Sequence, residues 1–394
     1  MRPRCGGLRA HIGVCGIGFG HASRSALIAK KLKEMGWGLS LSSYGDGLEY
    51  LRRMDLEVKS TPIVRYGILP EAKVSIKLTI FRNLLLPIRF AEQIAYEINY
   101  LEGADIIISD SRASTIVVGK LLGKPVLTIL NQFNIRIEYP RYRRIIELLE
   151  GIAHIVGWIW ARSDKILIAD YPPPLTISKQ NLVIPDRIKD RVEFIGPILD
   201  KRPEDLPSRE DIEIKYRLNG DRPIIFFHAT GPSYERRKLI EELLPMLGRL
   251  VDRYEIIASF GGMNPKVDVP NGIKAFEWVD EPLELFKVSD LVICRAGQTT
   301  LAKALSYGKP VLIIPISAHG EQLGNALSVA EVGAGVVIRQ EELTPELLER
   351  TIEELLSNKS YRINSEKYAE FSFSLNPLSR VVEVIEELLG KARR

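Results

Sequence analysis

The chain has 394 residues, of which 45% are hydrophobic and 26% are charged, the ordinary composition of a protein that folds unaided into two or three domains. Its net charge of +4 suits an acidic ligand or an anionic surface but is too small to indicate nucleic acid binding. Three widely spaced cysteines argue against a disulfide framework and a zinc site, and the absence of uncharged runs of roughly 18 residues argues against a membrane span.

The first predicted unit is a strand over residues 10–15, a glycine-rich loop and a helix over residues 23–35. Such loops bind dinucleotides, but the next strand, residues 39–43, does not end on the acidic residue that would hold a ribose. The pattern therefore argues against an NAD site. It places His21 at the rim of the loop, where the residue could simply form a local hydrogen bond at the start of the helix.

Two stretches of the first half, residues 73–90 and 136–160, combine basic side chains with apolar residues at helical spacing. Basic amphipathic segments can lie on an anionic membrane surface. The alternative is that both helices pack against the N-terminal sheet and line a ligand cleft. We prefer this alternative because aliphatic stripes at helical spacing are usually core.

A predicted strand over residues 105–110 ends on Asp110 and precedes a helix over residues 114–122. A carboxylate at a strand end can orient a neighbouring imidazole and stabilise its protonated form. Taken alone, however, such an aspartate is more often the N-cap of the following helix.

Composition divides the chain into domains. Residues 1–197 form the first predicted domain, and residues 198–222, which are charged and contain Pro203, Pro207 and Gly220, have the composition of a linker. Residues 223–375 form a second strand-and-helix domain, and residues 376–394 form an amphipathic helix.

The second domain contains the clearest candidate for an anion site. A buried strand over residues 290–294 leads to Gly297, and Thr299 or Thr300 can cap the helix that follows. The N-terminus of such a helix suits a diphosphate, which a glycine lets approach the backbone closely. The next strand, residues 310–315, ends in a polar loop that faces the same crevice, since ligands of open α/β sheets lie beyond the carboxyl ends of the strands.

Three features of this region resemble the donor-binding signature of GT-B glycosyltransferases: Arg295-Ala296-Gly297, the eleven-residue step to Gly308, and Glu321-Gln322 followed by Asn325-Ala326. The pattern is similar to that of MurG-type N-acetylglucosaminyltransferases and UDP-glycosyltransferases. The resemblance implies an α/β protein of GT-B fold, with two Rossmann-like domains whose parallel sheets face a central cleft. Residues 1–197 would bind the acceptor, residues 223–375 would bind the nucleotide sugar, and the helix at 376–394 would pack back on the first domain.

The same resemblance implies roles for individual residues. Trp278, nineteen residues before Gly297, would stack on the base, the helix start would hold the diphosphate, and the Glu321-Gln322 pair would bind sugar hydroxyls. The full set of implied donor-binding residues is Trp278, Val279, Arg295, Gly297, Gln298, Thr299, Thr300, Glu321, Gln322 and Asn325.

The N-terminal pattern Gly18-x-Gly20-His21-x-x-Arg24 is similar to the acceptor loop of these families. The resemblance implies that His21 faces the acceptor and that Asp110 partners it, which makes these two the catalytic residues. Gly18, Gly20 and Arg24 are the implied acceptor-binding residues.

One residue departs from the family pattern. Six residues after Gly297, where these families usually carry a glutamate that binds the donor ribose, this chain has Lys303. A charged lysine cannot accept a hydrogen bond, so the ribose must be held differently or the donor site has changed.

We therefore expect an inverting glycosyltransferase that moves a hexosyl or N-acetylhexosaminyl group from a nucleotide diphosphate sugar, UDP-linked by resemblance, to an acceptor hydroxyl. The acceptor is left open, a lipid-linked one included. We expect no cofactor and no metal, since the chain contains no Asp-x-Asp pair. We expect a cytoplasmic location, with contact at the inner face of the membrane left open. The alternatives are a sugar-nucleotide 2-epimerase of the same fold and a non-catalytic sugar-nucleotide-binding subunit.

Overall fold

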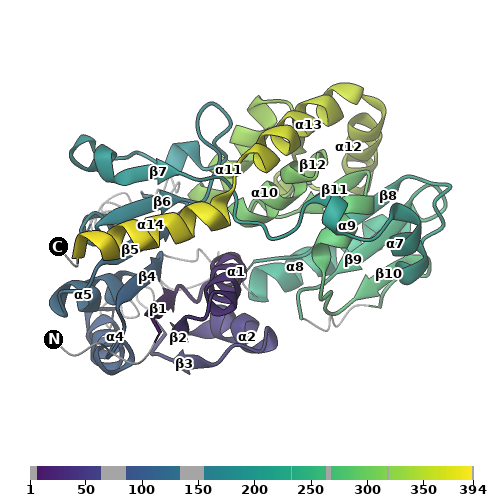
Figure 1. The fold of residues 1–394 in the computed structure, drawn as a ribbon. Coiled ribbons are helices and arrows are strands. Elements are labelled where there is room, and N and C mark those ends of the chain that lie inside the picture. Colours follow the sequence, from purple (N-terminus) through teal and green to yellow (C-terminus); the bar gives the residue numbers. More distant parts are fainter. Residues whose placement is uncertain are drawn as a thin grey trace. The chain divides into compact units, whose positions relative to one another are not determined.

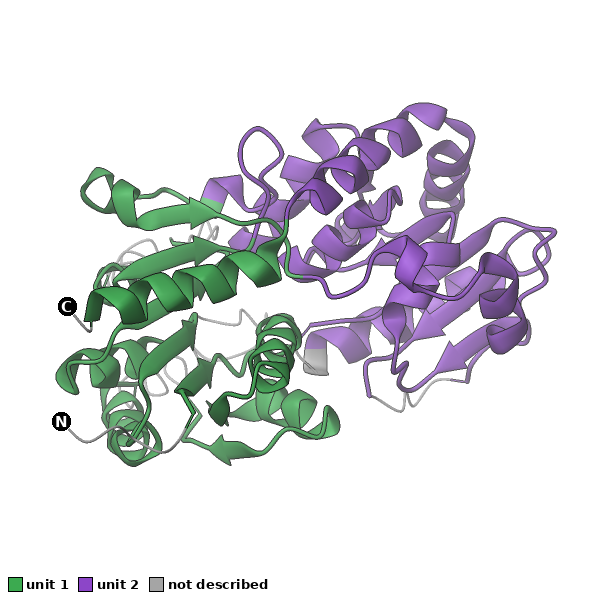
Figure 2. Cartoon of the chain, in the orientation of Figure 1, with its two compact units in different colours: residues 1–169, 181–198, 376–394 green, residues 170–180, 199–375 purple. Residues whose placement is uncertain are grey.

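The computed structural model describes residues 7–63, 86–133, 155–231, 233–262, 268–316 and 319–392. The chain divides into two compact units, which have different colours in Figure 2. Unit 1 contains residues 1–169, 181–198 and 376–394, and unit 2 contains residues 170–180 and 199–375.

Unit 1 is built on a parallel sheet. Its strands are β1 (Arg9–Val14), β2 (Gly38–Ser43), β3 (Val58–Ser60), β4 (Ile106–Asp110), β5 (Val126–Leu130), β6 (Lys165–Ile168) and β7 (Val192–Phe194). They pair in the order β3-β2-β1-β4-β5-β6-β7 (Figure 1). Every residue of β4 and β5 is buried, as expected for parallel strands covered on both faces.

The helices of unit 1 cover both faces of this sheet. They are α1 (Gly20–Glu34), α2 (Gly45–Arg53), α4 (Leu86–Tyr100), α5 (Ala113–Leu121) and α14 (Pro377–Ala392), with the 3-10 helix η2 (Asp186–Arg191). Side chains alternate between the faces: Ile106 and Ile108 of β4 pack in a core cluster with α1 and α14, and Ile107 packs in another with α5. The C-terminal helix α14 is held in unit 1 by this cluster and by Arg380, whose Nε and Nη2 lie 2.6 and 3.1 Å from the two carboxylate oxygens of Glu193.

Unit 2 contains a second parallel sheet. Its strands are β8 (Ile224–His228), β9 (Glu255–Ser259), β10 (Ile273–Phe276), β11 (Leu291–Cys294), β12 (Val311–Ile313) and β13 (Gly335–Val337), in the order β10-β9-β8-β11-β12-β13. Its helices are α7 (Arg209–Tyr216), α8 (Ser233–Gly248), α9 (Pro282–Val288), α10 (Gln298–Ser306), α11 (Gly320–Glu331), α12 (Pro345–Ser357) and α13 (Lys359–Ser374). The remaining 3-10 helices are η1 (Lys179–Asn181), η3 (Pro203–Asp205) and η4 (Gln340–Glu342).

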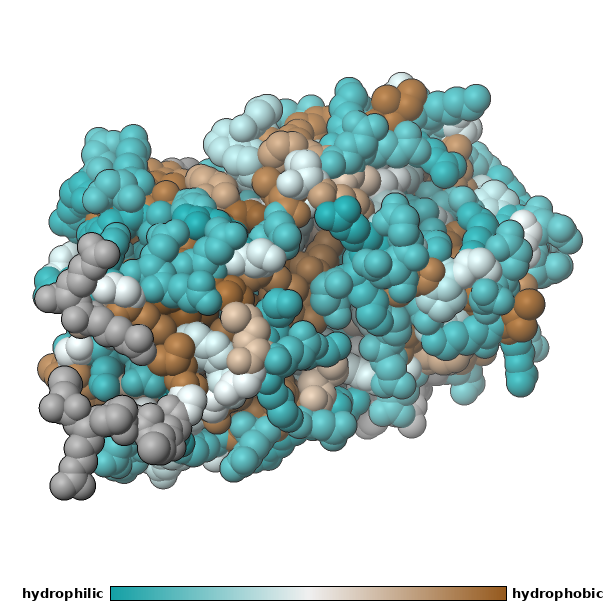
Figure 3. Space-filling model, viewed as in Figure 1, coloured by the Kyte–Doolittle hydropathy of each residue, from teal (hydrophilic) through white to brown (hydrophobic). Residues whose placement is uncertain are grey.

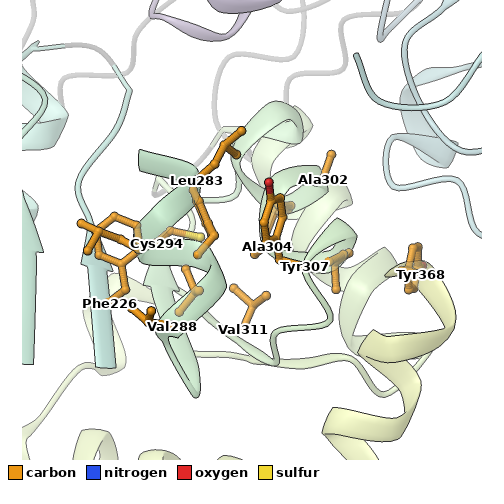
Figure 4. Packing of buried hydrophobic residues seen from close by; sticks show 14 of the residues in the cluster. Phe226, Leu283, Val288, Cys294, Ala302, Ala304, Tyr307, Val311 and Tyr368 are labelled. Atoms are coloured by element: carbon orange, nitrogen blue, oxygen red, sulfur yellow. The ribbon is translucent and has the colours of Figure 1, made fainter. Parts of the chain in front are cut away.

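A single apolar cluster fixes α10 on its sheet. Figure 4 shows Phe226 of β8, Cys294 of β11 and Leu283 of α9 packed beside Ala304 of α10, with Tyr368 of α13 in the same cluster. Burial of this kind contributes roughly 25 cal/mol for each Å² of apolar surface removed from water. The start of α10 is therefore held rigidly beyond the end of β11.

Both sheets reverse their strand order at one place, which in open α/β sheets opens a crevice at the carboxyl ends of the strands. In unit 1 the reversal lies between β1 and β4, where Val14 is paired with Asp110. In unit 2 it lies between β8 and β11, where His228 is paired with Cys294. The loop before His21 follows β1, and the loop containing Gly297 follows β11.

Of the stretch expected to be a linker, residues 198–222, all but Ile198 belongs to unit 2, and it contains α7. Ser208 caps this helix by accepting a hydrogen bond from the backbone N–H of Asp211, and Ile212 and Tyr216 are buried in the core of the unit. Its charged residues lie on the exposed side of a short amphipathic helix. Charge and proline content therefore suggested a linker where the structure has a capped, packed helix.

The basic apolar stretches at 73–90 and 136–160, for which a membrane-surface or cleft-lining role was considered, lie largely outside the described residues. No helix in the described part of the chain is long and apolar enough to cross a membrane. Polar side chains cover most of the face shown in Figure 3.

Candidate functional site

The switch point of unit 1 brings His21 and Asp110 together. His21 is the second residue of α1, and Asp110 is the last residue of β4. The His21 Nδ1 atom lies 2.7 Å from Asp110 Oδ1. The His21 side chain is 15% exposed and the Asp110 side chain is fully buried, so the imidazole alone of this pair reaches the surface.

The contact between them decides which nitrogen of His21 can act as a base. Burial alone would raise the pKa of Asp110, but the charges of Arg24 and His21 outweigh it and lower that pKa to about 2. Asp110 is therefore a carboxylate at neutral pH and can only accept, so the hydrogen bond at 2.7 Å requires the tautomer with the hydrogen on Nδ1. Arg24 Nη2, which lies 2.9 Å from the same nitrogen, then donates to Asp110 and not to His21. With Nδ1 protonated, Nε2 of the neutral ring has a free electron pair that can accept a proton.

Arg24, expected at the acceptor, has its guanidinium on Asp110 instead. Its Nε donates to Oδ2 at 2.7 Å and its Nη2 donates to Oδ1 at 2.5 Å, and the side chain is nearly fully buried. The hydroxyl of Ser25 donates to Oδ2 at 3.0 Å. Both oxygens of Asp110 are thus held, which fixes the carboxylate against His21.

The glycine loop between β1 and α1 has open space at Gly18. Gly18 has φ +64°, a Cβ added to it would meet no atom within 4 Å, and its N–H donates to Asp46 Oδ2 at 3.1 Å. Gly16 is required for a different reason, since a Cβ there would lie 1.9 Å from the Tyr44 carbonyl oxygen. Gly20, the second of the two expected glycines, is the first residue of α1.

The switch point of unit 2 joins the loop after β8 to the start of α10. Thr230 Oγ1 lies 3.1 Å from Thr300 Oγ1, in the first turn of the helix. Gly297, the N-cap of α10, has φ −67° and ψ 125°, a conformation open to any residue. A Cβ on it would meet only Thr300 Oγ1, at 4.0 Å. The backbone conformation therefore does not require glycine at position 297. Close approach of a ligand to the helix N-terminus would require it.

Arg295, expected to contact the donor, is buried and bound to protein groups. Its Nη1 donates to the carbonyl oxygens of Ile314 and Pro315 at 3.2 Å each and to Gln340 Oε1 at 2.8 Å, and its Nη2 donates to the Glu235 carbonyl oxygen at 2.9 Å. These bonds tie the end of β12 to η4 and α8. Both terminal nitrogens of Arg295 are therefore occupied by protein acceptors.

The other expected donor residues form two groups. Some have side chains that brace loops or lie in the core, and the others are half-buried or lie at the start of a helix. Asn325 Nδ2 donates to the Ala296 carbonyl oxygen at 3.0 Å, and Gln322 Oε1 accepts from the Ile316 N–H at 3.0 Å, so both side chains brace loops. Val279 is buried in the core cluster of unit 2. Trp278, Thr299 and Glu321 are half-buried, and Gln298 and Thr300 are buried residues in the first turn of α10.

Two glycosyltransferase family models match the chain. The glycosyl transferase family 1 model matches residues 8–193, and the glycosyltransferase family 28 C-terminal domain matches residues 227–381. An uncharacterized glycosyltransferase of Methanopyrus kandleri is 28% identical over 85% of this chain and 94% of its own length. The UDP-N-acetylglucosamine–N-acetylmuramyl-(pentapeptide) pyrophosphoryl-undecaprenol N-acetylglucosamine transferase of Geobacillus thermodenitrificans is 25% identical over 93% of this chain and 95% of its own.

Solved structures agree on the fold. Acinetobacter baumannii MurG superposes with a TM-score of 0.60 at 19% identity, covering 96% of this chain and 99% of that one. The kitacinnamycin glycotransferase superposes with a TM-score of 0.69 at 15% identity, covering 98% of this chain and 100% of that one. The chain is a GT-B glycosyltransferase. The fold and enzyme class expected from the sequence are thereby confirmed.

A buried ionic network in unit 1 of the glycosyltransferase, which was not predicted from the sequence, joins Glu97, Arg112 and His11. Arg112 Nη2 is 2.7 Å from Glu97 Oε1, and His11 Nε2 is 3.4 Å from Glu97 Oε2. Burial would raise the pKa of Glu97, but the charges of Arg112 and His11 lower it to about 2. The sequence offers one signal for this network: Gln93 and Glu97 are polar residues four apart in α4, and both are buried.

His228, the last residue of β8, lies at the carboxyl end of a strand beside the switch point of unit 2. Burial, assisted by the charges of Lys303 and Arg236, lowers the pKa of His228 to about 3, so this imidazole is neutral. Its Nδ1 is buried without a hydrogen-bond partner in the described part of the chain. His228 therefore supplies no positive charge to the carboxyl end of β8.

Replacing Arg295 of the glycosyltransferase with methionine should lower the free energy of unfolding by about 2–4 kcal/mol, because several buried acceptors lose their donor. Nucleotide affinity of the folded protein should stay unchanged. Urea unfolding and calorimetric titration with UDP measure the two effects. The exposed Arg350 of α12, changed to methionine, is the control. Unchanged stability with a large loss of UDP affinity would show that Arg295 contacts the ligand after all.

Proposed function

We propose that this enzyme is an inverting glycosyltransferase that transfers a hexosyl or N-acetylhexosaminyl group from a UDP-linked donor to an acceptor hydroxyl. The observation that carries the proposal is the contact between His21 Nδ1 and the buried Asp110 carboxylate, which leaves Nε2 as a base. The named Geobacillus transferase, which uses UDP-N-acetylglucosamine, supports the choice of donor.

In the proposed reaction, His21 Nε2 takes the proton of the acceptor hydroxyl as its oxygen bonds to the anomeric carbon. The bond from that carbon to the diphosphate oxygen breaks, and the nucleotide diphosphate leaves with the electron pair. Direct attack from the face opposite the leaving group inverts the anomeric configuration. Asp110 stabilises the imidazolium that forms, since the two charges are opposite and in contact.

The departing diphosphate would bind at the start of α10. The helix N-terminus carries partial positive charge and donor N–H groups, which stabilise a developing anion without a metal or any other cofactor. The open space beside Gly297 lets a phosphate come close to the backbone there. We expect transfer to persist in EDTA for this reason.

A lipid-linked acceptor is our proposal for the second substrate. The name of the Geobacillus relative specifies a pyrophosphoryl-undecaprenol acceptor, and such acceptors lie at membranes. The enzyme would then work in the cytoplasm, peripherally on the inner face of the cell membrane.

The experiment that tests this function is calorimetric titration with UDP, GDP, dTDP and their sugar conjugates, followed by a transfer assay with polyprenyl-linked and soluble acceptors in detergent and in anionic vesicles. We expect one UDP-sugar to bind and to be consumed only when an acceptor is added. Binding of none of these nucleotides would refute the proposed function. Turnover of the donor without acceptor would point to epimerisation instead.

Replacing Gly297 with alanine should weaken binding of the nucleotide sugar by about tenfold or more, roughly the loss of one backbone hydrogen bond to a charged group. The melting temperature should not change, because the φ of −67° suits alanine and the methyl group has space. The contrasting control is Gly16→Ala, which should destabilise unit 1 by a clash with the Tyr44 carbonyl. Unchanged affinity in Gly297→Ala would move the diphosphate away from α10.

A further inference from the structure

Lys303 is a half-buried cation in unit 2 that makes no ion pair with any of the described residues. It lies in the second turn of α10, beneath the proposed diphosphate site. Within the described part of the chain, its ammonium nitrogen has no hydrogen-bond or ion-pair partner. The carboxylates whose charges act on it are Asp200 and Glu281, and Glu281 is itself bound to Lys201. Holding an ammonium group partly out of water without a partner costs free energy, so we expect an anion to bind beside it.

The geometry of a helix directs this side chain toward the site. Side chains of α-helices tilt toward the N-terminus and cover the turn that precedes them. Lys303 therefore reaches over Thr299 and Thr300, which are four and three residues earlier in the first turn of α10. The charge of Lys303 also helps to lower the pKa of His228, which places the ammonium near the carboxyl end of β8.

The neighbouring cations have other roles. The terminal nitrogens of Arg295 are used by carbonyl and amide oxygens of the protein. Arg236 is nearly fully buried and donates to the Gly231 carbonyl oxygen at 3.3 Å. His228 is neutral. Lys303 is thus the cation near the start of α10, among the described residues, whose donors are available to a ligand.

We propose that Lys303 binds the diphosphate of the donor and stabilises the negative charge that develops on it as the glycosidic bond breaks. This inference rests on the proposed function. The ammonium donates charge-assisted hydrogen bonds to phosphate oxygens and keeps its protons throughout, so the leaving group departs as the diphosphate anion. The same position could instead bind ribose hydroxyls, and the two ligands are separable because uridine lacks the phosphates.

The test compares Lys303→Gln with Lys367→Gln, which removes the same charge from the exposed face of α13. Affinities for UDP, UMP and uridine are measured by calorimetry, with competition for the weak ligands. Lys303→Gln should weaken UDP binding by about 10- to 100-fold, the worth of a charge-assisted hydrogen bond. Uridine affinity should not change, and Lys303→Arg should restore most of the loss.

A stability measurement adds a readout that a structural lysine would not give. Lys303→Met should raise the melting temperature of the nucleotide-free enzyme by a few degrees, since it removes a partly desolvated charge without breaking a contact. UDP should stabilise this variant less than it stabilises the wild type.

Three results would overturn the proposal. Equal losses for UDP and uridine in Lys303→Gln would place the lysine on the nucleoside. Equal losses of UDP affinity in Lys303→Gln and Lys367→Gln would show that the effect comes from long-range electrostatics and not from a contact. Unchanged UDP affinity in Lys303→Gln would show that Lys303 does not contact the diphosphate. A wild-type enzyme that binds none of the nucleotide diphosphates would instead refute the proposed function itself.

Discussion

Replacing His21 with alanine is expected to lower kcat by about 10²- to 10⁴-fold, the usual contribution of a general base. The affinity for the nucleotide sugar should stay at its wild-type value, because His21 belongs to unit 1 and the donor residues belong to unit 2. Initial rates at saturating donor and acceptor, together with calorimetric titration of the donor, measure the two quantities.

A second variant separates proton acceptance from structure. Glutamine at position 21 can still donate a hydrogen bond to the Asp110 carboxylate, as His21 Nδ1 does at 2.7 Å, but it offers no basic nitrogen. His21→Gln should therefore melt close to the wild type and turn over as slowly as His21→Ala. Wild-type turnover in either variant would remove His21 from the mechanism.

The placement of these residues was predictable from the sequence where the signals are local. Apolar runs ending at Asp110 and before Gly297 indicate buried strands, and the glycines that follow indicate loops. Because parallel strands end at one edge of a sheet, residues at those ends are expected close together. The structure places His21 beside Asp110 and Thr230 beside Thr300 in this way.

Long-range partners were not predictable. Arg24 and Arg295 both stand next to loop glycines, so each looks like a ligand contact in the sequence. Whether a guanidinium faces a ligand or a buried protein acceptor depends on Asp110, 86 residues away, for Arg24 and on Gln340, 45 residues away, for Arg295, which no local pattern encodes. The network of Glu97 with Arg112 and His11 escaped notice for the same reason.

The linker prediction failed because composition does not reveal how residues divide between faces. Residues 198–222 are charged enough for a solvated segment, yet α7 buries Ile212 and Tyr216 four residues apart on one side. The Tyr216 hydroxyl donates to Glu284 at 2.9 Å, which fixes the helix against α9. Two buried apolar residues are too few to form a helical pattern that can be recognised in the sequence.

Replacing Asp110 with asparagine is expected to lower both kcat and stability. An amide cannot hold His21 Nδ1–H as a carboxylate does or stabilise the imidazolium, so the rate should approach that of His21→Ala. The buried Arg24 guanidinium also loses its counter-ion, which should cost about 3–5 kcal/mol of unfolding free energy. Urea unfolding measures this loss. The control is Asp186→Asn, which removes an exposed partner of Lys189 and should leave stability unchanged.

The loss of unfolding free energy at acid pH gives an independent check on the role of the Asp110 carboxylate. The folded pKa of Asp110 is about 2, below its ordinary value of 3.8, so its carboxylate stabilises the fold above the unfolded pKa and this contribution is lost as pH falls from about 4 toward 2. A shift of this size corresponds to roughly 2–3 kcal/mol. The wild type should lose that stability over this interval, and Asp110→Asn should lose less of it because the group no longer titrates.

The double variant Asp110→Asn, Arg24→Met separates the structural loss from the catalytic one. Methionine removes the unpaired charge, so the double variant should regain stability relative to Asp110→Asn while its kcat stays low. No gain in stability would show that Arg24 is not what the carboxylate neutralises. A return of activity would show that His21 works without an anion behind it, and the proposed pair would then be a structural contact alone.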